Sequence, residues 1–146
     1  MKTIHLLDVN VLVAAAWPTH RDHEKAQAWL ARHARGGWAT CPLTQTSFVR
    51  ILSNPAFSPN ALTPRDALLL LESNLAHPGH LFWADDIGLV QACERLARNL
   101  TGHQQVTDAY LLGLAIHKKG KLVTMDRGVR TLLPEKSPER DIVVLL

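Results

Sequence analysis

The chain has 146 residues, 47% of them hydrophobic and 20% charged, with a formal net charge of +3. That length suffices for one domain over residues 1–146 whose core needs neither disulfide bonds nor a structural metal. The composition excludes a disordered or low-complexity chain, and no apolar stretch reaches the roughly 18 residues of a membrane span. Cys41 and Cys93 lie far apart in apolar surroundings, so we expect buried free thiols and a reducing, cytoplasmic location.

The first half of the chain alternates short apolar runs with segments of helical periodicity. The run over 3–7 ends abruptly at Asp8, as in a strand buried on both faces. A short helix over 9–16 follows, and Pro18 ends it. A helix over 22–35, ended by glycines, precedes a second strand over 38–41.

The second half continues this alternation. The expected helices cover 44–53, 63–76, 87–99 (capped by Asp85 or Asp86) and 107–118, with a short helix after the turn at Asp126. The expected strands cover 80–83, 121–125 and 142–146. This order predicts an α/β fold, a three-layer sandwich with helices on both faces of a mainly parallel five-stranded sheet.

Three acids and one amide are predicted to meet at one edge of this sheet. Helix N-termini and the carboxyl ends of parallel strands lie along the same edge. Asp8 follows the first strand and Asp126 the fourth, while Gln45 and Asp108 each open an expected helix. Ligands of such sheets usually bind in the crevice at this edge.

Three carboxylates in one crevice repel one another unless a cation or a proton compensates them. Their oxygen-only donor set favours Mg²⁺, with Mn²⁺ as an alternative, over zinc. Such a cation activates water for attack on phosphorus and stabilises the charge of the transition state. Each acid alone has a structural alternative, with Asp8 as a helix cap, Asp108 at a helix dipole and Asp126 in its turn. Their joint placement is what favours phosphodiester hydrolysis.

The charge of the chain is compatible with a nucleic-acid substrate. There are 16 Lys and Arg against 13 Asp and Glu, and the basic excess grows if three acids bind metal. A polyanion suits such a surface. A well-solvated basic surface is the plainer alternative, and charge alone favours it.

Three motifs carry these acids: Leu7-Asp8-Val9-Asn10, Val106-Thr107-Asp108-Ala109-Tyr110-Leu111-Leu112 and Thr124-Met125-Asp126-Arg127-Gly128. In this order, with Pro42-Leu43-Thr44 and Phe48-Val49-Arg50 between them, they resemble the PIN-domain ribonucleases, most closely the VapC-type toxins of bacterial toxin–antitoxin pairs. The resemblance spans essentially the whole chain. It implies a sheet of order 3-2-1-4-5, Mg²⁺-dependent endoribonuclease activity on RNA, a homodimer, and an antitoxin that covers the active site.

One position departs from the family pattern. PIN nucleases commonly have a glutamate where this chain has Gln45. A glutamine carbonyl can still orient water, but the site loses a negative charge and some metal affinity. Two functions therefore remain open: a metal-dependent toxin ribonuclease, and a PIN-fold module that binds RNA or protein without catalysis.

Further residues are candidates for supporting roles. Thr124 lies two positions before Asp126, so both side chains can point the same way, and in the resembling family a hydroxyl here supports the acids. Asn10 either bonds a ligand or caps the helix. Arg50, Arg127 and Arg130 are candidates for phosphate contacts, with Arg127 the best placed and an ordinary surface position the default for the other two.

Zinc has little support in the sequence. Among eight histidines, His20 and His23 come nearest to a ligand pair, but no cysteine pattern or His-Glu-x-x-His motif accompanies them. Glycine-rich phosphate loops and serine or cysteine nucleophile motifs are absent as well.

Overall fold

The computed structural model describes residues 2–146. The strands and α-helices follow one another in the order β1 (His5–Leu7), α1 (Val9–Ala16), α2 (His23–His33), β2 (Trp38–Thr40), α3 (Pro42–Leu52), α4 (Pro64–Leu75), β3 (His80–Phe82), α5 (Leu89–Ala92), α6 (Val106–His117), β4 (Lys121–Thr124) and β5 (Val143–Leu145). Short 3-10 turns add η1 (Ala34–Gly36), η2 (Ala97–Asn99), η3 (His103–Gln105), η4 (Arg127–Leu132) and η5 (Pro138–Ile142). The expected strands and most expected helices are confirmed.

The five strands form one sheet of order β3-β2-β1-β4-β5, in which every neighbouring pair is parallel. This confirms the predicted order. β1 is the central strand, and its partners β2 and β4 flank it on either side. The carboxyl ends of all five strands therefore lie along one edge.

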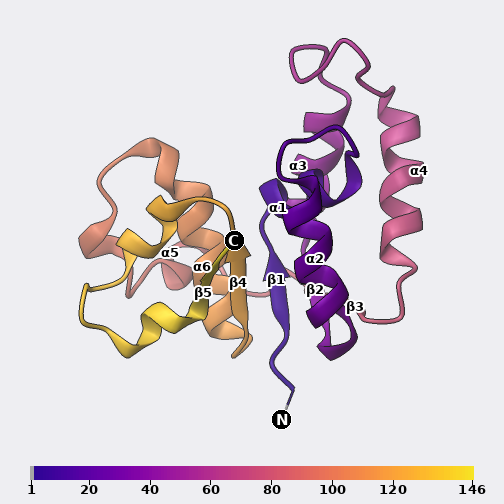
Figure 1. Ribbon diagram of the computed structural model, residues 1–146. Coiled ribbons are helices and arrows are strands. Elements are labelled where there is room, and N and C mark those ends of the chain that lie inside the picture. Colours follow the sequence, from indigo (N-terminus) through magenta and orange to yellow (C-terminus); the bar gives the residue numbers. More distant parts are fainter. Residues whose placement is uncertain (1) are drawn as a thin grey trace.

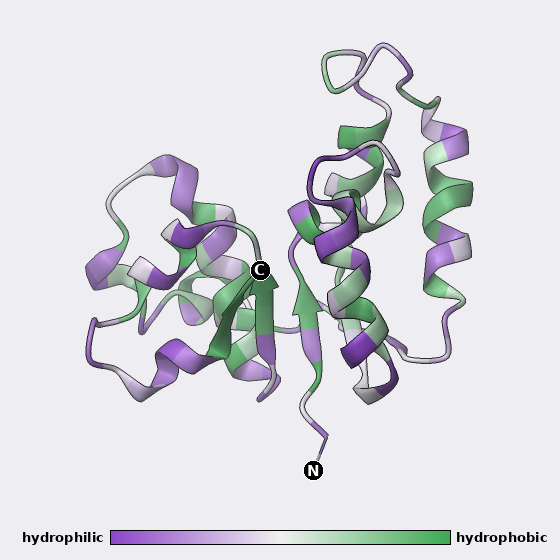
Figure 2. Ribbon diagram, viewed as in Figure 1, coloured by the Kyte–Doolittle hydropathy of each residue, from purple (hydrophilic) through white to green (hydrophobic). Residues whose placement is uncertain are grey.

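Two hydrophobic cores cover the two faces of the sheet, because successive residues of a strand point to opposite faces. Leu6 and Leu122 pack in the core that contains the buried residues of α5 and α6. Leu7 and Val123 pack in the core that contains the buried residues of α1, α2, α3 and α4. Figure 1 shows these two groups of helices on either side of β1 and β4. Figure 2 shows the same strands as largely hydrophobic and the outer turns as hydrophilic.

Two helices, rather than one, connect β1 to β2 and β2 to β3. In the second connection α3 and α4 pack side by side as a hairpin. The turn between them is closed by the Leu62 backbone N–H, which donates to the Leu52 carbonyl oxygen at 2.8 Å. Thr63 caps α4, since its hydroxyl accepts the Asp66 backbone N–H at 3.1 Å. Only the first helix of each pair begins at the crevice.

The predicted start of α3 was two residues late. The helix begins at Pro42, whose missing N–H costs nothing in the first helical position. Thr44 lies one turn inside the helix, where its hydroxyl accepts the Cys41 backbone N–H at 3.0 Å. Gln45 consequently lies in the second helical turn, and still near the sheet edge.

The prediction of one long helix over 87–99 was wrong. Only α5 is α-helical there, followed by turns and η2. A Cβ on Gly113 of α6 would lie 2.1 Å from the Ala92 carbonyl oxygen, so the two segments are in direct backbone contact. After Ala92 the chain continues in tighter turns that bury Cys93 and Leu96 against the same core.

The predicted cap of that helix was wrong as well. Gly88 is the N-cap of α5. Asp86 instead pairs with Lys118, at 2.8 Å, and with His117, at 3.2 Å, just beyond and at the end of α6. These ion pairs hold the loop after β3 against α6.

Other predictions from composition agree with the structure. Cys41 and Cys93 are both free and buried. Within residues 2–146, no helix has the length and apolar character needed to cross a membrane. Gly37 has φ +106°, a conformation that favours glycine, which explains why the chain turns there before β2.

Candidate active site

Asp8 lies at the carboxyl end of the central strand, where it caps a helix and also accepts a bond from the end of the neighbouring strand. Its Oδ1 accepts the Val9 backbone N–H at 2.7 Å, which caps α1. Its Oδ2 accepts the Thr124 hydroxyl at 2.8 Å, across the sheet from the end of β4. The side chain is only 5% exposed, and burial raises the pKa of this carboxyl while the bond from Thr124 opposes the rise.

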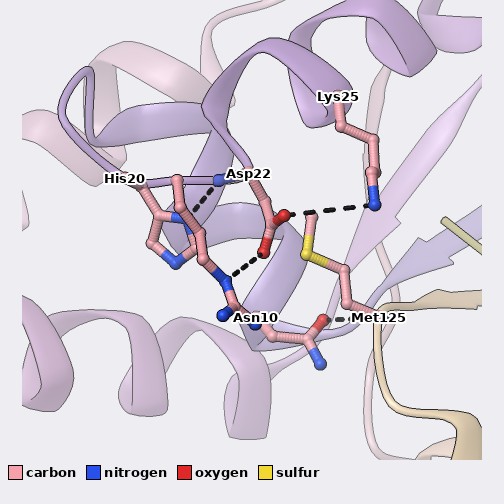
Figure 3. Close-up of polar contacts among 6 residues, drawn as sticks. Asn10, His20, Asp22, Lys25 and Met125 are labelled. Carbon is pink, nitrogen blue, oxygen red and sulfur yellow. Dashed lines mark hydrogen bonds and ion pairs between the residues drawn. The ribbon is translucent and has the colours of Figure 1, made fainter.

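Thr124 and Asn10 connect the ends of β1 and β4. The Thr124 hydroxyl, besides donating to Asp8, accepts the Asp126 backbone N–H at 3.1 Å and the Asn10 side-chain amide at 3.3 Å. The Asn10 carbonyl oxygen accepts the Met125 backbone N–H at 3.3 Å, the contact drawn in Figure 3. Asn10 is therefore not the helix cap, and both ends of its amide bind within the protein.

Asp108 lies in the first turn of α6 and faces the other two acids. Burial raises the pKa of Asp108 to about 7, with the negative charges of Asp8 and Asp126 and a hydrogen bond to Asp126 as further causes. The structure thus brings together the three carboxylates from β1, α6 and the end of β4. The charges of Asp8 and Asp126 make Asp108 harder to ionise, and the charge of Asp126 also raises the pKa of Asp8.

This donor set fits a hard divalent cation. Oxygen atoms are the preferred ligands of Mg²⁺ and Mn²⁺, and a positive charge would remove the repulsion that holds the Asp108 proton. Within residues 2–146 no three His, Cys, Asp or Glu side chains form a ready-made metal cage. The three carboxylates are neighbours, but in this arrangement they do not by themselves form such a group.

Gln45 is held by residues that the sequence did not point to. Its side-chain N–H donates to the Thr40 hydroxyl at 2.9 Å, and the Thr40 oxygen lies 2.7 Å from Nε2 of His80. The pKa of His80 is lowered by burial and by the neighbouring His77. The bond to Thr40 leaves the carbonyl oxygen as the free end of the Gln45 amide. In the described part of the chain Gln45 makes no hydrogen bond to the three acids.

The predicted phosphate-binding arginines lie in different places. Arg127 follows Asp126 directly and is exposed at the crevice. Arg50 is exposed in the last turn of α3, where it lines a groove between α3 and α4 together with Gln45. Arg130 is half-buried and binds the Val143 carbonyl oxygen at 2.9 Å.

The structure does not favour the His20 and His23 pair as zinc ligands. Nδ1 of His20 accepts the Asp22 backbone N–H at 3.0 Å, a contact visible in Figure 3 beside the pairing of Asp22 with Lys25. Nδ1 of His23 lies 2.8 Å from the Ala14 carbonyl oxygen. Each ring is thus engaged separately within the turn between α1 and α2.

Comparison with known proteins identifies the family. The model of the PIN domain matches residues 5–132, which include all three carboxylates and Gln45. This chain belongs to the PIN domain family. The PIN domain is also similar to three ribonucleases of Mycobacterium tuberculosis: VapC38 (44% identical, covering 96% of this chain and 99% of the relative), VapC39 (40%, 83% and 87%) and VapC44 (39%, 85% and 87%).

Solved structures support the same fold. This PIN domain resembles a chain in the crystal structure of VapBC2 from Rickettsia felis bound to a DNA fragment from their promoter, with a TM-score of 0.65. The similarity covers 98% of this chain and 97% of the other, at 15% sequence identity. At that identity the likeness establishes the fold alone.

Proposed function

We propose that this PIN domain is a metal-dependent endoribonuclease that hydrolyses RNA phosphodiester bonds and acts as the toxin of a toxin–antitoxin pair. One observation carries the proposal: Asp8, Asp108 and Asp126 converge at the sheet edge, and their mutual repulsion helps to raise the pKa of Asp108 to about 7. Carboxylates gathered without a compensating charge destabilise the fold, so a purely structural role does not explain why they lie together. The relatives named ribonucleases point to the same reaction.

The three acids have distinct parts in this proposal. Asp8 is the most buried of the three, and the Thr124 hydroxyl holds its carboxylate in place, so it serves as the metal ligand with the most fixed position. Asp126 is exposed and reaches the open side of the crevice, and Asp108 completes the set after losing its proton. Mg²⁺ is the expected ion, with Mn²⁺ as a substitute, and it would polarise the phosphate and lower the pKa of an attacking water. Thr124 positions Asp8, and the Gln45 carbonyl oxygen is available to orient a water.

The partners follow from the same assignment. The substrate is RNA, bound in part by Arg127, with Arg50 contacting it farther along α3. The family resemblance favours a homodimer and an antitoxin that covers the crevice. An RNA substrate and two reduced thiols suit a cytoplasmic place of action.

Gln45 supports a second candidate function. Without the negative charge that is common at this position, the fold would bind RNA or a protein partner and have little or no catalytic activity. Metal-dependent turnover separates the two functions.

The deciding experiment is cleavage of labelled tRNA and messenger RNA by purified protein with Mg²⁺ or Mn²⁺. EDTA and the Asp8→Asn variant serve as controls, the variant because contaminating ribonucleases imitate activity. We expect metal-dependent cutting that falls at least about a hundredfold in the variant, since one ligand of the cation is lost. Circular dichroism checks that the variant remains folded.

Absence of cutting by clean wild-type protein, over several RNAs and both metals, would favour the binding module. Equal cutting by the wild type and the Asp8→Asn variant would rule out the proposed site.

A further inference from the structure

Three arginines line a cavity directly beside the carboxylate cluster. The cavity has a volume of about 540 Å³ and is lined by Arg127, Arg130, Thr131, Arg140, Leu145 and Leu146. Arg127, Arg130 and Thr131 belong to η4, the 3-10 turn that begins immediately after Asp126. Leu145 and Leu146 lie at and just after the end of β5.

The cavity lies on the same edge of the sheet as the three acids. The Leu146 backbone N–H donates to the Thr124 carbonyl oxygen at 3.0 Å, which holds the end of β5 beside the end of β4. Thr124 in turn holds Asp8. A strand of nucleic acid lying over the carboxylates can thus continue past Asp126 into this cavity.

The guanidinium groups of Arg130 and Arg140 are only partly hydrogen-bonded by the protein. A terminal N–H of Arg130 donates to the Val143 carbonyl oxygen at 2.9 Å, and one of Arg140 donates to the Leu133 carbonyl oxygen at 3.4 Å. The Nε atoms of both are buried, and neither has a hydrogen-bond partner in the described part of the chain. A buried donor without a partner is costly to keep, so these guanidiniums are incompletely satisfied by the protein itself.

The charge at this cavity is not neutralised locally. Among residues 2–146, no carboxylate forms an ion pair with Arg127, Arg130 or Arg140. Glu139, which precedes Arg140, is paired with Arg95 instead. Three cations around one cavity, next to a cluster of acids, leave the crevice with a negative and a positive end.

We propose that this cavity is a subsite for an RNA backbone phosphate next to the one that is cleaved. Guanidinium groups bind phosphate oxygens with a planar fork of donors, which Arg130 and Arg140 hold in place through their backbone contacts. Contacts to phosphates fix the register of a nucleic acid without reading its sequence. The subsite rests on the proposed function and assigns Arg130 and Arg140 the role of holding the strand across the carboxylates.

Binding can be measured separately from cleavage. The Asp8→Asn variant, in EDTA, is titrated with a fluorescently labelled single-stranded RNA oligonucleotide, and anisotropy gives the Kd at several salt concentrations. Arg127→Gln, Arg130→Gln and Arg140→Gln are added singly, and the last two also together. Arg32→Gln is the matched control, because Arg32 is exposed in the last turn of α2 and forms no ion pair within residues 2–146.

We expect about tenfold weaker binding for each arginine removed, which corresponds to the loss of one charge-assisted contact. The slope of log Kd against log salt should fall by about 0.7 in the double variant, as for one phosphate released from a single strand. Arg32→Gln should bind as the parent does. Arg130→Lys with Arg140→Lys should keep the salt slope but lose affinity, since lysine has the charge without the fork.

A second probe locates the phosphate. A single neutral methylphosphonate linkage is moved along the oligonucleotide, and one position should weaken binding to the parent while having no effect in the double variant. Inorganic phosphate is added as a competitor of the labelled RNA. If it displaces the labelled RNA as effectively as unlabelled RNA does, the cavity is a general anion site and the assignment to the RNA backbone is overturned. The Arg127 side chain forms no hydrogen bond or ion pair within residues 2–146, so the result for Arg127→Gln does not depend on the fold surviving the changes at Arg130 and Arg140.

The subsite is wrong if all arginine variants bind RNA as tightly as Arg32→Gln does. That outcome leaves the nuclease intact if the wild type still cuts RNA in a metal-dependent way. Loss of binding in the arginine variants, with no cleavage by the wild type, would keep the subsite and remove the proposed catalysis.

Discussion

At the scale of single residues, Gln45 is the side chain whose replacement most directly tests the site. Its amide is oriented by Thr40, so that its carbonyl oxygen is free and its N–H is not. A carboxylate at the same place would accept the Thr40 hydroxyl with one oxygen and keep the other, charged, for a cation.

Gln45→Glu should therefore strengthen metal binding. We expect Mn²⁺ to bind at least several times more tightly by calorimetry, because a fourth carboxylate adds charge and a hard oxygen ligand. Gln45→Asn, which keeps the amide but shortens its reach, is the matched control. Unchanged or weaker Mn²⁺ binding in the Gln45→Glu variant would place Gln45 outside the metal site.

Asp108 gives the site a dependence on pH. If Asp108 is a metal ligand, as proposed, a proton on it competes with the cation, and the pKa of about 7 puts that competition near neutrality. Below pH 7 the affinity for Mn²⁺ should fall about tenfold for each pH unit, and it should level off above. Calorimetry between pH 5.5 and 8.5, run in parallel on Asp108→Asn, measures this, and identical slopes for the two proteins would contradict it.

The same carboxyl also affects metal-free stability. An unfolded Asp releases its proton near pH 3.8, whereas the pKa of folded Asp108 is raised to about 7. Between these values the folded state binds more protons, so stability falls as pH rises through this window. Urea unfolding in EDTA should show that decline in the wild type and a flatter profile in Asp108→Asn.

At the scale of elements, the fold depends on a close contact between α5 and α6. Gly113 lies in the buried middle of α6, and a Cβ there would meet the Ala92 carbonyl oxygen at 2.1 Å. The obstructing atom is backbone, so it cannot move aside as a side chain would. α5 and α6 therefore approach each other at backbone distance at this point.

Gly113→Ala should consequently destabilise the protein, although alanine is the better helix former. We expect a loss of about 1–3 kcal/mol in the free energy of unfolding, as for overpacking in a core. Gly36→Ala is the control, because a Cβ at Gly36 meets nothing within 4 Å. Equal stability of the two variants in urea would show that α5 can shift away from the added Cβ at little cost in free energy.

At the scale of the whole molecule, the carboxylate cluster joins parts of the chain that pack in different layers. Asp8 follows the central strand, Asp126 follows β4, and Asp108 opens α6. Binding of one cation would draw the two strand ends and α6 together and relieve the repulsion among the acids. Metal binding and fold stability are then thermodynamically linked.

Mg²⁺ should raise the melting temperature at pH 8. At a concentration a hundredfold above its Kd the stabilisation is about 2.7 kcal/mol, or several degrees for a chain of this size. Asp8→Asn combined with Asp126→Asn should abolish the shift, while Asp66→Asn, at the exposed start of α4, should keep it. Scanning calorimetry of the three proteins with and without Mg²⁺ provides the measurement, and a shift that survives in the double variant would point to binding elsewhere.

Much of the architecture could be predicted because it depends on local pattern. Apolar runs of strand length, helical periodicity and breakers such as Pro18 and Gly37 are encoded in neighbouring residues. Parallel strands then require their carboxyl ends to share an edge, which places Asp8 and Asp126 together by direction alone. The helix over 87–99 was not predicted correctly, because the chain after Ala92 packs in tight turns against a core built by other elements, and neighbouring residues do not encode that packing.

The sequence by itself determined which elements form, their order in the sheet through the family resemblance, and which acids face one edge. Only the tertiary structure decided how those acids are held. Thr124 reaches Asp8 across 116 positions of chain, Asn10 reaches Thr124 across 114, and His80 reaches Thr40 across 40. The guanidiniums of Arg130 and Arg140 gather at one cavity in the same way. Such contacts depend on how separately folded elements pack, and no local periodicity carries that information.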